Sequence, residues 1–148
     1  MQKVFAVLAV AAITLFAVTG CRSTEEDNPG PAPKYTLEQR QAMGVEIIQA
    51  FQKNDYAKLA VHLSPEVKAQ LNATQFAEKN GEIRKNLGEI QSCDYLTELD
   101  APIFKSLIWK VTFVRTDKDG KAVRQQLLFR LVTGELGNKL VAVGFWFI

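Results

Sequence analysis

The last third of the chain alternates apolar with polar residues at the two-residue period typical of β-strands. This pattern predicts three successive antiparallel strands, over residues 104–116, 121–133 and 139–148. The expected connections are Asp119-Gly120 and Gly137-Asn138, dipeptides that are typical of tight hairpin turns. One face of the strands collects large apolar side chains. These are Leu107, Trp109, Val111, Phe113, Leu127, Phe129, Leu131, Val141, Val143, Phe145 and Phe147.

The residues before these strands repeat at the spacing of helices and can cover that apolar face. Thr36 and Gln39 fit a capping box, which predicts the start of a first helix. Asn54-Asp55 ends it, and Ser64-Pro65 starts another, with serine as the cap and proline in the first turn. Thr74 is the predicted cap of the last helix. The residues expected to face the sheet are Met43, Ile47, Ala50, Phe51, Tyr56, Leu59, Ala60, Leu63, Val67, Leu71, Phe76, Asn80, Ile83 and Leu87.

A fourth strand is predicted between the helices and the other three strands. Gly88 is placed to end the last helix in a left-handed turn. The period then returns to two over residues 89–99, and Asp100-Ala101-Pro102 turns into the next strand. The order is therefore helices first, then four strands in an antiparallel meander. Packing in layers predicts an α+β domain with the helices on one face of the sheet.

Three segments of the sequence resemble those of a known protein superfamily with the predicted arrangement. They are Phe51-Gln52-Lys53-Asn54-Asp55-Tyr56, Leu63-Ser64-Pro65-Glu66-Val67 and Leu87-Gly88-Glu89-Ile90. Together with the order of elements, they make residues 36–148 resemble the nuclear transport factor 2-like superfamily, a cone-shaped α+β fold. The resemblance implies N-terminal helices packed on one face of a curved four-stranded antiparallel sheet. Because that superfamily includes isomerases, dehydratases, hydrolases and non-catalytic binding modules, the fold alone leaves the function open.

The N-terminus has the pattern of an export signal. Lys3 supplies one positive charge, and residues 4–18 are apolar apart from Thr14. This run is shorter than the roughly 20 residues of a membrane-spanning helix but suits the hydrophobic core of a secretory signal. It ends in Val18-Thr19-Gly20-Cys21, which resembles the lipobox of bacterial lipoproteins. A signal peptide with a chance cysteine and a retained membrane anchor are the alternatives.

The lipobox resemblance implies that Cys21 is acylated on its sulfur, as with palmitate, and again on its amino group after residues 1–20 are removed. Because each buried methylene contributes about 0.8 kcal/mol, several acyl chains would hold the protein on a membrane. Arg22 follows the cysteine, in place of the aspartate that commonly marks retention at the inner membrane. We therefore expect a cell-envelope protein, on the outer membrane and facing the periplasm if the host has two membranes.

Composition divides the chain and limits its partners. Residues 1–20 are the predicted signal peptide, residues 21–34 a lipidated cysteine with a flexible linker, and residues 35–148 one domain. The net charge is only +2. The sequence has no cluster of Lys and Arg side chains that could neutralise nucleic-acid phosphates, so we expect no nucleic-acid partner.

No residue is assigned a catalytic role from the sequence. His62 is the only histidine and has no Cys or carboxylate at the spacing of metal ligands, so we expect no metal and a histidine at a helix surface or end. Cys93 is the only thiol once Cys21 is acylated, and we expect it to be a small buried hydrophobe. A disulfide between two copies and a nucleophilic pair with His62 are the alternatives. Asp117-Lys118-Asp119-Gly120 lacks the closing glutamate of a calcium loop and reads as a hairpin turn. No cofactor is expected.

The opposite face of the sheet is a candidate interface. Simple exposure to solvent would make it mostly polar, but Lys110 and Arg130 are mixed there with apolar residues that end in Trp146. The expected set is Ile108, Lys110, Thr112, Val114, Leu128, Arg130, Val132, Ala142, Gly144, Trp146 and Ile148. The resemblance implies dimers formed through this face. We predict a homodimer whose interface includes Ile108, Lys110, Leu128, Arg130 and Trp146; a different protein partner and cover by the linker or a loop are the alternatives.

The space between the helices and the sheet is the second candidate site. Its expected polar lining is Tyr56, Asn80, Asp94 and Tyr95, depending on the register of the first strand. In the resembled enzymes this cavity holds acid–base residues, usually an aspartate with histidine or tyrosine. Here aromatic residues dominate, which favours a filled core over a small apolar ligand or catalysis.

These observations predict a lipid-anchored cell-envelope protein whose α+β domain is a binding or assembly module. The alternative is an isomerase- or hydrolase-type enzyme that uses Asp94 and Tyr56 in the cone pocket. An open pocket with Asp94 pointing inward would favour the enzyme. A packed interior would leave only surfaces for function.

Overall fold

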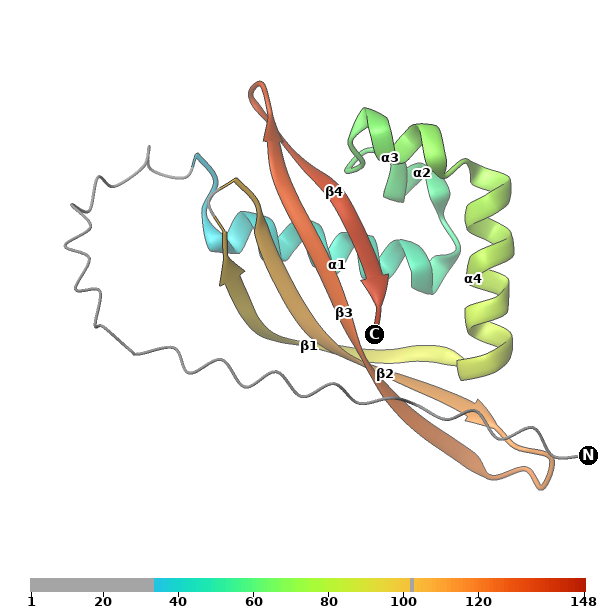
Figure 1. Cartoon of the computed structure of the whole chain (residues 1–148). Coiled ribbons are helices and arrows are strands. Elements are labelled where there is room, and N and C mark those ends of the chain that lie inside the picture. The colour runs from blue at the N-terminus through green and yellow to red at the C-terminus, as the bar shows by residue number, and fades with distance from the viewer. Residues whose placement is uncertain (1–33, 102) are drawn as a thin grey trace, which may run out of the picture. The chain divides into compact units, whose positions relative to one another are not determined.

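Four helices precede a four-stranded antiparallel sheet in the computed structural model, which describes residues 34–101 and 103–148 (Figure 1). The helices are α1 (Leu37–Lys53), α2 (Tyr56–Ala60), α3 (Pro65–Gln70) and α4 (Ala73–Leu87). The strands are β1 (Glu89–Asp100), β2 (Lys105–Thr116), β3 (Ala122–Leu136) and β4 (Lys139–Phe147), and they lie in that order in the sheet. The predicted α+β class and the helices-first order are confirmed. Cys21, the predicted signal peptide and the predicted linker up to residue 33 lie outside the described residues.

Capping residues set most of the helix boundaries as predicted. Thr36 and Gln39 form the reciprocal capping box of α1, with N–O distances of 2.8 and 3.3 Å. Asp55 caps α2, and Ser64 caps α3 with Pro65 in its first turn. No helix within residues 34–101 and 103–148 is long and apolar enough to cross a membrane.

The predicted cap of the last helix is wrong by two residues. Asn72 caps α4, because its side chain accepts a hydrogen bond from the Gln75 amide while the Gln75 side chain bonds back to the Asn72 amide. Thr74 lies inside the first turn instead. At the other end Gly88 has a φ of +93°, and a Cβ atom there would lie 2.1 Å from the carbonyl oxygen of Val114. Only glycine therefore fits this helix end.

The core forms where α1 crosses one face of the sheet (Figure 1). At Gly44 the helix approaches the sheet closely, since a Cβ atom there would lie 2.1 Å from the ring of Trp109. Phe51 at the end of α1 makes edge-to-face contacts with rings from α4, β3 and β4, at centroid distances of 5.1–6.4 Å. The predicted inward residues of β2 are all buried, as are Phe129 and Leu131 of β3.

A β-bulge changes which face β4 presents to the helices. Val132 pairs with Gly144 and Thr133 with Ala142, so Val143 is an extra residue on β4. Ala142 consequently joins the core, and Val143 lies beside Gly134 on the opposite face. Val141, which pairs with Gly134, shares that face. The prediction that Val141 and Val143 face the helices and Ala142 faces away is therefore wrong, because a bulge shifts the two-residue alternation.

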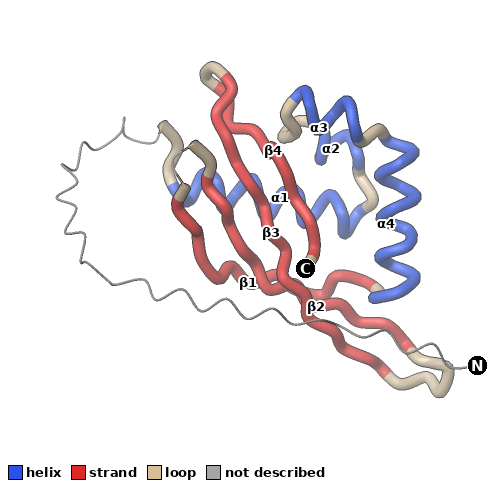
Figure 2. The backbone as a smooth tube through the Cα atoms, in the orientation of Figure 1, coloured by secondary structure: helices blue, strands red, loops and turns tan. Residues whose placement is uncertain are grey.

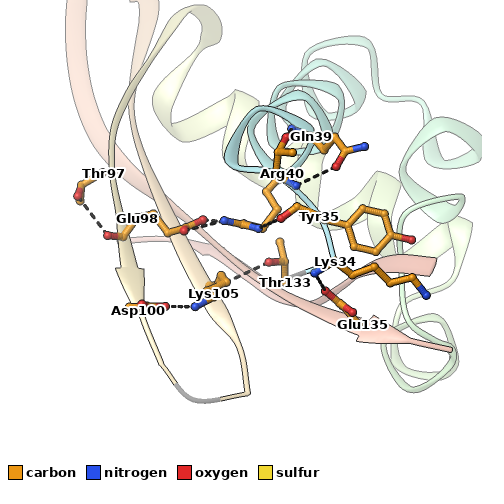
Figure 3. Close-up of polar contacts among 11 residues, drawn as sticks. Lys34, Tyr35, Gln39, Arg40, Thr97, Glu98, Asp100, Lys105, Thr133 and Glu135 are labelled. Atoms are coloured by element: carbon orange, nitrogen blue, oxygen red, sulfur yellow. Dashed lines mark hydrogen bonds and ion pairs between the residues drawn. The ribbon is translucent and has the colours of Figure 1, made fainter. Parts of the chain in front are cut away.

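A mostly buried ion pair fastens the start of α1 to β1 (Figure 3). Arg40 donates to both carboxylate oxygens of Glu98, at 2.7 and 2.8 Å, and to the carbonyl oxygen of Tyr35. The side chains of Arg40 and Glu98 are 7% and 19% exposed. Tyr35 donates in turn to the carbonyl oxygen of Asn138 in the β3–β4 turn. The first described residues are thus held at that end of the sheet.

Candidate functional site

Two of the predicted pocket residues hold the helices together. Asn80 is 1% exposed, and its side-chain nitrogen donates to the carbonyl oxygen of Phe51 and to the side-chain oxygen of Asn54, both at 2.9 Å. The hydroxyl of Tyr56 donates to the carbonyl oxygen of Leu71 at 2.5 Å. These hydrogen bonds join α4 to the end of α1 and α2 to the end of α3. They occupy the side-chain nitrogen of Asn80 and the hydroxyl hydrogen of Tyr56.

The other two predicted pocket residues lie on opposite faces of β1. Tyr95 pairs with Trp109 across the ladder, and their rings meet edge to face at 5.6 Å inside the core. Asp94 lies on the far face, where its carboxylate is 3.2 Å from the ammonium of Lys110. The structure therefore does not bring the four predicted pocket residues together. The register of β1 decides this, as the sequence analysis anticipated.

The predicted interface residues do lie together, on the face of the sheet away from α1. Cross-strand pairing puts Ile108, Arg130 and Trp146 in one row and Lys110 beside Leu128 in the next. We call these five residues the outer patch. The side chains of Leu128 and Trp146 are 38% and 41% exposed, so apolar area on this face is open to solvent.

Arg130 is the central charge of the outer patch. Its guanidinium carbon lies 5.1 Å from the centre of the Trp146 ring, a cation–π arrangement. One terminal nitrogen donates to the hydroxyl of Ser106 at 3.0 Å. Its Nε is buried without a hydrogen-bond partner among residues 34–101 and 103–148. A buried donor without an acceptor is costly, and an acceptor from another molecule can relieve this cost only if the guanidinium shifts to expose its Nε.

A groove runs along β4 between that strand and helices α3 and α4. Its volume is about 560 Å³, within the range of about 300–1,000 Å³ that small-ligand sites occupy. The lining residues are Phe51, Val67, Gln70, Leu71, Lys79, Ile83, Val143, Gly144, Phe145, Trp146 and Phe147. Lys79 is the one charged residue in this lining. The groove was not predicted from the sequence, because its far wall forms only where α3 and α4 pack opposite β4.

His62 follows α2, a helix-end position as expected. Its Nε2 lies 2.8 Å from a carboxylate oxygen of Glu46, in a second groove of about 490 Å³ that Asp55 and Lys58 also line. A carboxylate at this distance can orient an imidazole for proton transfer. Within the described part of the chain, no three His, Cys, Asp or Glu side chains are placed to hold a metal ion.

Cys93 lies on the helix side of β1, half-buried opposite Val111. Burial raises the pKa of the Cys93 thiol above its usual value, and the neighbouring Asp94 carboxylate raises the pKa further. A thiol with a raised pKa stays protonated at neutral pH and is a weak nucleophile. The position suits the small apolar residue that the sequence analysis expected.

Comparison with known proteins identifies the fold. No protein-family model and no curated protein matches the sequence. Solved structures do match, including a candidate dehydratase of the NTF2-like family from Streptomyces avermitilis, with a TM-score of 0.53 and 11% identity over 76% of this chain and 95% of that one. A SEC-C motif containing protein from Rhodopseudomonas palustris matches with a TM-score of 0.51 and 11% identity over 72% and 77% of the two chains. AclR, a candidate hydroxylase from Streptomyces galilaeus, matches with a TM-score of 0.50 and 13% identity over 76% and 79%. At such identities the likeness shows the fold alone, which is NTF2-like.

Proposed function

We propose that this chain is a lipid-anchored cell-envelope protein whose NTF2-like domain is a binding or assembly module, and that it self-associates through the outer patch. The outer patch is the observation that carries the proposal. It exposes Trp146 and Leu128 on a sheet face and holds a buried guanidinium nitrogen of Arg130 that finds no acceptor in the part of the chain that the structure describes. Exposed apolar area around a charged centre is typical of protein interfaces. The interior supports the same proposal, because Tyr56 and Asn80 already bond within the domain.

A second copy of the chain is the partner that this face fits. A two-fold contact brings the same patch together from both sides, so the patch must complement itself. The patch with its neighbour Asp94 presents charges of both signs, since the Asp94 carboxylate lies beside Lys110 in the row next to Arg130. In a two-fold contact the carboxylate of one copy is available to the guanidinium of the other. Such pairing, with a shift of the buried guanidinium, supplies an acceptor for the Nε of Arg130 that residues 34–101 and 103–148 do not provide.

Replacement of Trp146 by glutamate is expected to weaken self-association at least about tenfold, since buried tryptophans are among the strongest contributors to interfaces. The measurement is the mass of the mature protein by sedimentation over a range of concentrations. Leu136→Glu is the matched control, because Leu136 is also exposed but lies outside the patch, at the β3–β4 turn. A monomeric wild-type protein, or a dimer that Trp146→Glu leaves intact, would contradict the proposal.

Cys21 is proposed as the site of acylation. In cells given an alkyne analogue of palmitate, the wild-type protein is expected to become labelled and to enter the detergent phase of a two-phase extraction. Cys21→Ser is expected to abolish the label and move the protein to the aqueous phase, because the acyl chains supply the membrane affinity. Cys93→Ser changes the other cysteine of the chain and should leave both results as in the wild type. An unlabelled wild-type protein would rule out the lipid anchor.

A small-molecule enzyme is the second candidate. The sequence predicted that such an enzyme would use Asp94 and Tyr56 in the cone pocket. The register of β1 puts the Asp94 carboxylate on the other face of the sheet. The observation that favours an enzyme is instead the pairing of His62 with Glu46 beside a groove. This candidate ranks second, because the pair lies outside the cone, in a groove on α1 and α2 that is lined mainly by polar residues.

A further inference from the structure

The edge of β4 is only partly covered by the rest of the domain. At Ala142 the edge is paired, since the Ala142 amide donates to the carbonyl oxygen of His62 at 2.7 Å and the Ser64 amide donates to the carbonyl oxygen of Ala142 at 2.9 Å. Leu63 thus acts as a one-residue strand parallel to β4. This pairing ends at Ala142, and α3 then leads the chain away from the strand.

Beyond Ala142, backbone groups of β4 point toward the groove. Leu128 and Ile148 exchange both of their backbone hydrogen bonds, at 2.8 and 3.1 Å. Hydrogen-bonded and non-bonded pairs alternate along an antiparallel ladder, so Trp146 is also bonded to β3. Phe145 and Phe147 therefore direct their N–H and C=O groups to the free side. Within residues 34–101 and 103–148, no backbone hydrogen bond beyond the sheet ladder reaches these groups.

The two edges of the sheet differ in how they resist pairing with another strand. The β1 edge has two bulges and carries carboxylates at Glu89, Asp94, Glu98 and Asp100. Bulges and charges are the usual means of blocking an edge. In β4, residues 140–147 contain no charged side chain, and a single bulge lies at Val143. The unblocked edge is that of β4, the strand nearest to α3 in the sheet (Figure 2). The groove runs along this strand.

We propose that the groove binds an extended peptide segment, which adds to the free edge of β4 as a further strand. A fatty acid or other apolar small molecule would fill the groove but leave the N–H and C=O groups of Phe145 and Phe147 unpaired. A peptide satisfies them and places alternate side chains against the apolar walls. Five residues, Val143 to Phe147, face the groove, so the bound strand covers about 17 Å.

The groove also determines the chemistry of the peptide. Its walls are apolar, and Lys79 is the one charged residue in the lining, so the segment is expected to be apolar with one carboxylate. A second copy of the domain fits poorly, because α3 and α4 form the far wall and would collide with the helices beside the other copy's β4 (Figure 1). A single extended segment has no such obstacle. The groove shares Trp146 with the outer patch, but Lys79 and the free backbone groups of Phe145 and Phe147 belong to the groove alone, so strand addition can fail independently of self-association.

Amide hydrogen exchange of the full chain, in a mild detergent, tests the proposal directly. The probe is a six-residue capped peptide of alternating valine and threonine with one central glutamate. In the free protein the amides of Phe145 and Phe147 are expected to exchange fast while that of Trp146 is protected. Saturating peptide is expected to slow exchange at Phe145 and Phe147 at least about tenfold. A copy of the peptide methylated on the backbone nitrogens that face β4 should bind at least about tenfold more weakly, because it cannot complete the ladder.

Charge variants complete the test. Lys79→Glu is expected to weaken binding of the glutamate peptide about fivefold and to favour a lysine-containing version, since the sign of the charge pairing is reversed. Lys85→Glu, on the same helix but outside the groove, should change the affinity less than about twofold. Equal binding of the methylated peptide, binding of decanoate alone, or no binding of any peptide at millimolar concentration would each overturn strand addition. An increase to twice the protein mass on adding peptide would do the same, because it would indicate pairing between copies.

Discussion

Arg40→Ala is expected to lower the free energy of unfolding by about 3 kcal/mol. The substitution removes both hydrogen bonds to Glu98 and leaves that carboxylate largely buried without its counter-charge. It also removes the donor to the carbonyl oxygen of Tyr35. Urea unfolding of the mature protein, with the slope m unchanged and the midpoint lowered, is the measurement.

An exposed ion pair elsewhere in the domain provides the control. Arg84 donates to Glu89 at 3.0 and 3.1 Å, but the two side chains are 38% and 63% exposed. Arg84→Ala should therefore cost less than about 1 kcal/mol. If both alanine variants lost the same free energy of unfolding, burial would not explain the contribution of the Arg40–Glu98 pair to stability. A double change of Arg40 to Met and Glu98 to Leu should recover most of the loss, because no unpaired charge remains.

Gly44→Ala is expected to destabilise the protein by about 2 kcal/mol, although alanine is the better helix former by about 1 kcal/mol. The reason is steric, since the added methyl would lie 2.1 Å from the ring of Trp109. Trp109 is 1% exposed and packed against Tyr95 and Phe129, so its ring has no free space to enter. Thermal or urea unfolding followed by the near-ultraviolet signal of the tryptophans measures both stability and the packing of this ring.

Gly81→Ala is the matched control for Gly44→Ala. Gly81 also lies inside a helix, but nothing is within 4 Å of a Cβ atom placed there. The substitution should stabilise the protein by about 0.5–1 kcal/mol through helix propensity alone. Opposite signs for the two glycines would support close packing of α1 on the sheet. A gain in stability from both changes would show that α1 lies further from Trp109 than the structure has it.

Local chemistry made much of the fold predictable from the sequence. The capping pair Thr36 and Gln39, the break at Asn54 and the start at Ser64 depend on neighbouring residues only, and each was found as predicted. The same rule misplaced the cap of α4, because Asn72 with Gln75 forms the reciprocal bonds that Thr74 cannot. Strand period also assigned the inner residues of β2 and β3 correctly.

The candidate sites were less predictable, because they depend on register and on tertiary packing. The outer patch was found since Lys110, Leu128 and Arg130 follow simple alternation on strands without bulges between them. Asp94 could not be assigned to one face, because bulges on either side of its segment of β1 shift the alternation. The groove along β4 had one visible signal, the run of uncharged residues from Leu140 onward, but its far wall depends on where α3 and α4 pack.

The contacts of Lys34 and Tyr35 determine how the domain would respond to mechanical load. Both residues bond to Asn138 in the β3–β4 turn. Lys34 also bonds to Glu135 of β3, and Arg40 joins the start of α1 to β1 (Figure 3). A pulling force applied through the residues before Lys34 would thus be shared with β3 and β4, through these hydrogen bonds, before it reached α1. The hairpin between β2 and β3 lies at the other end of the sheet from Lys34 and Tyr35 (Figure 1).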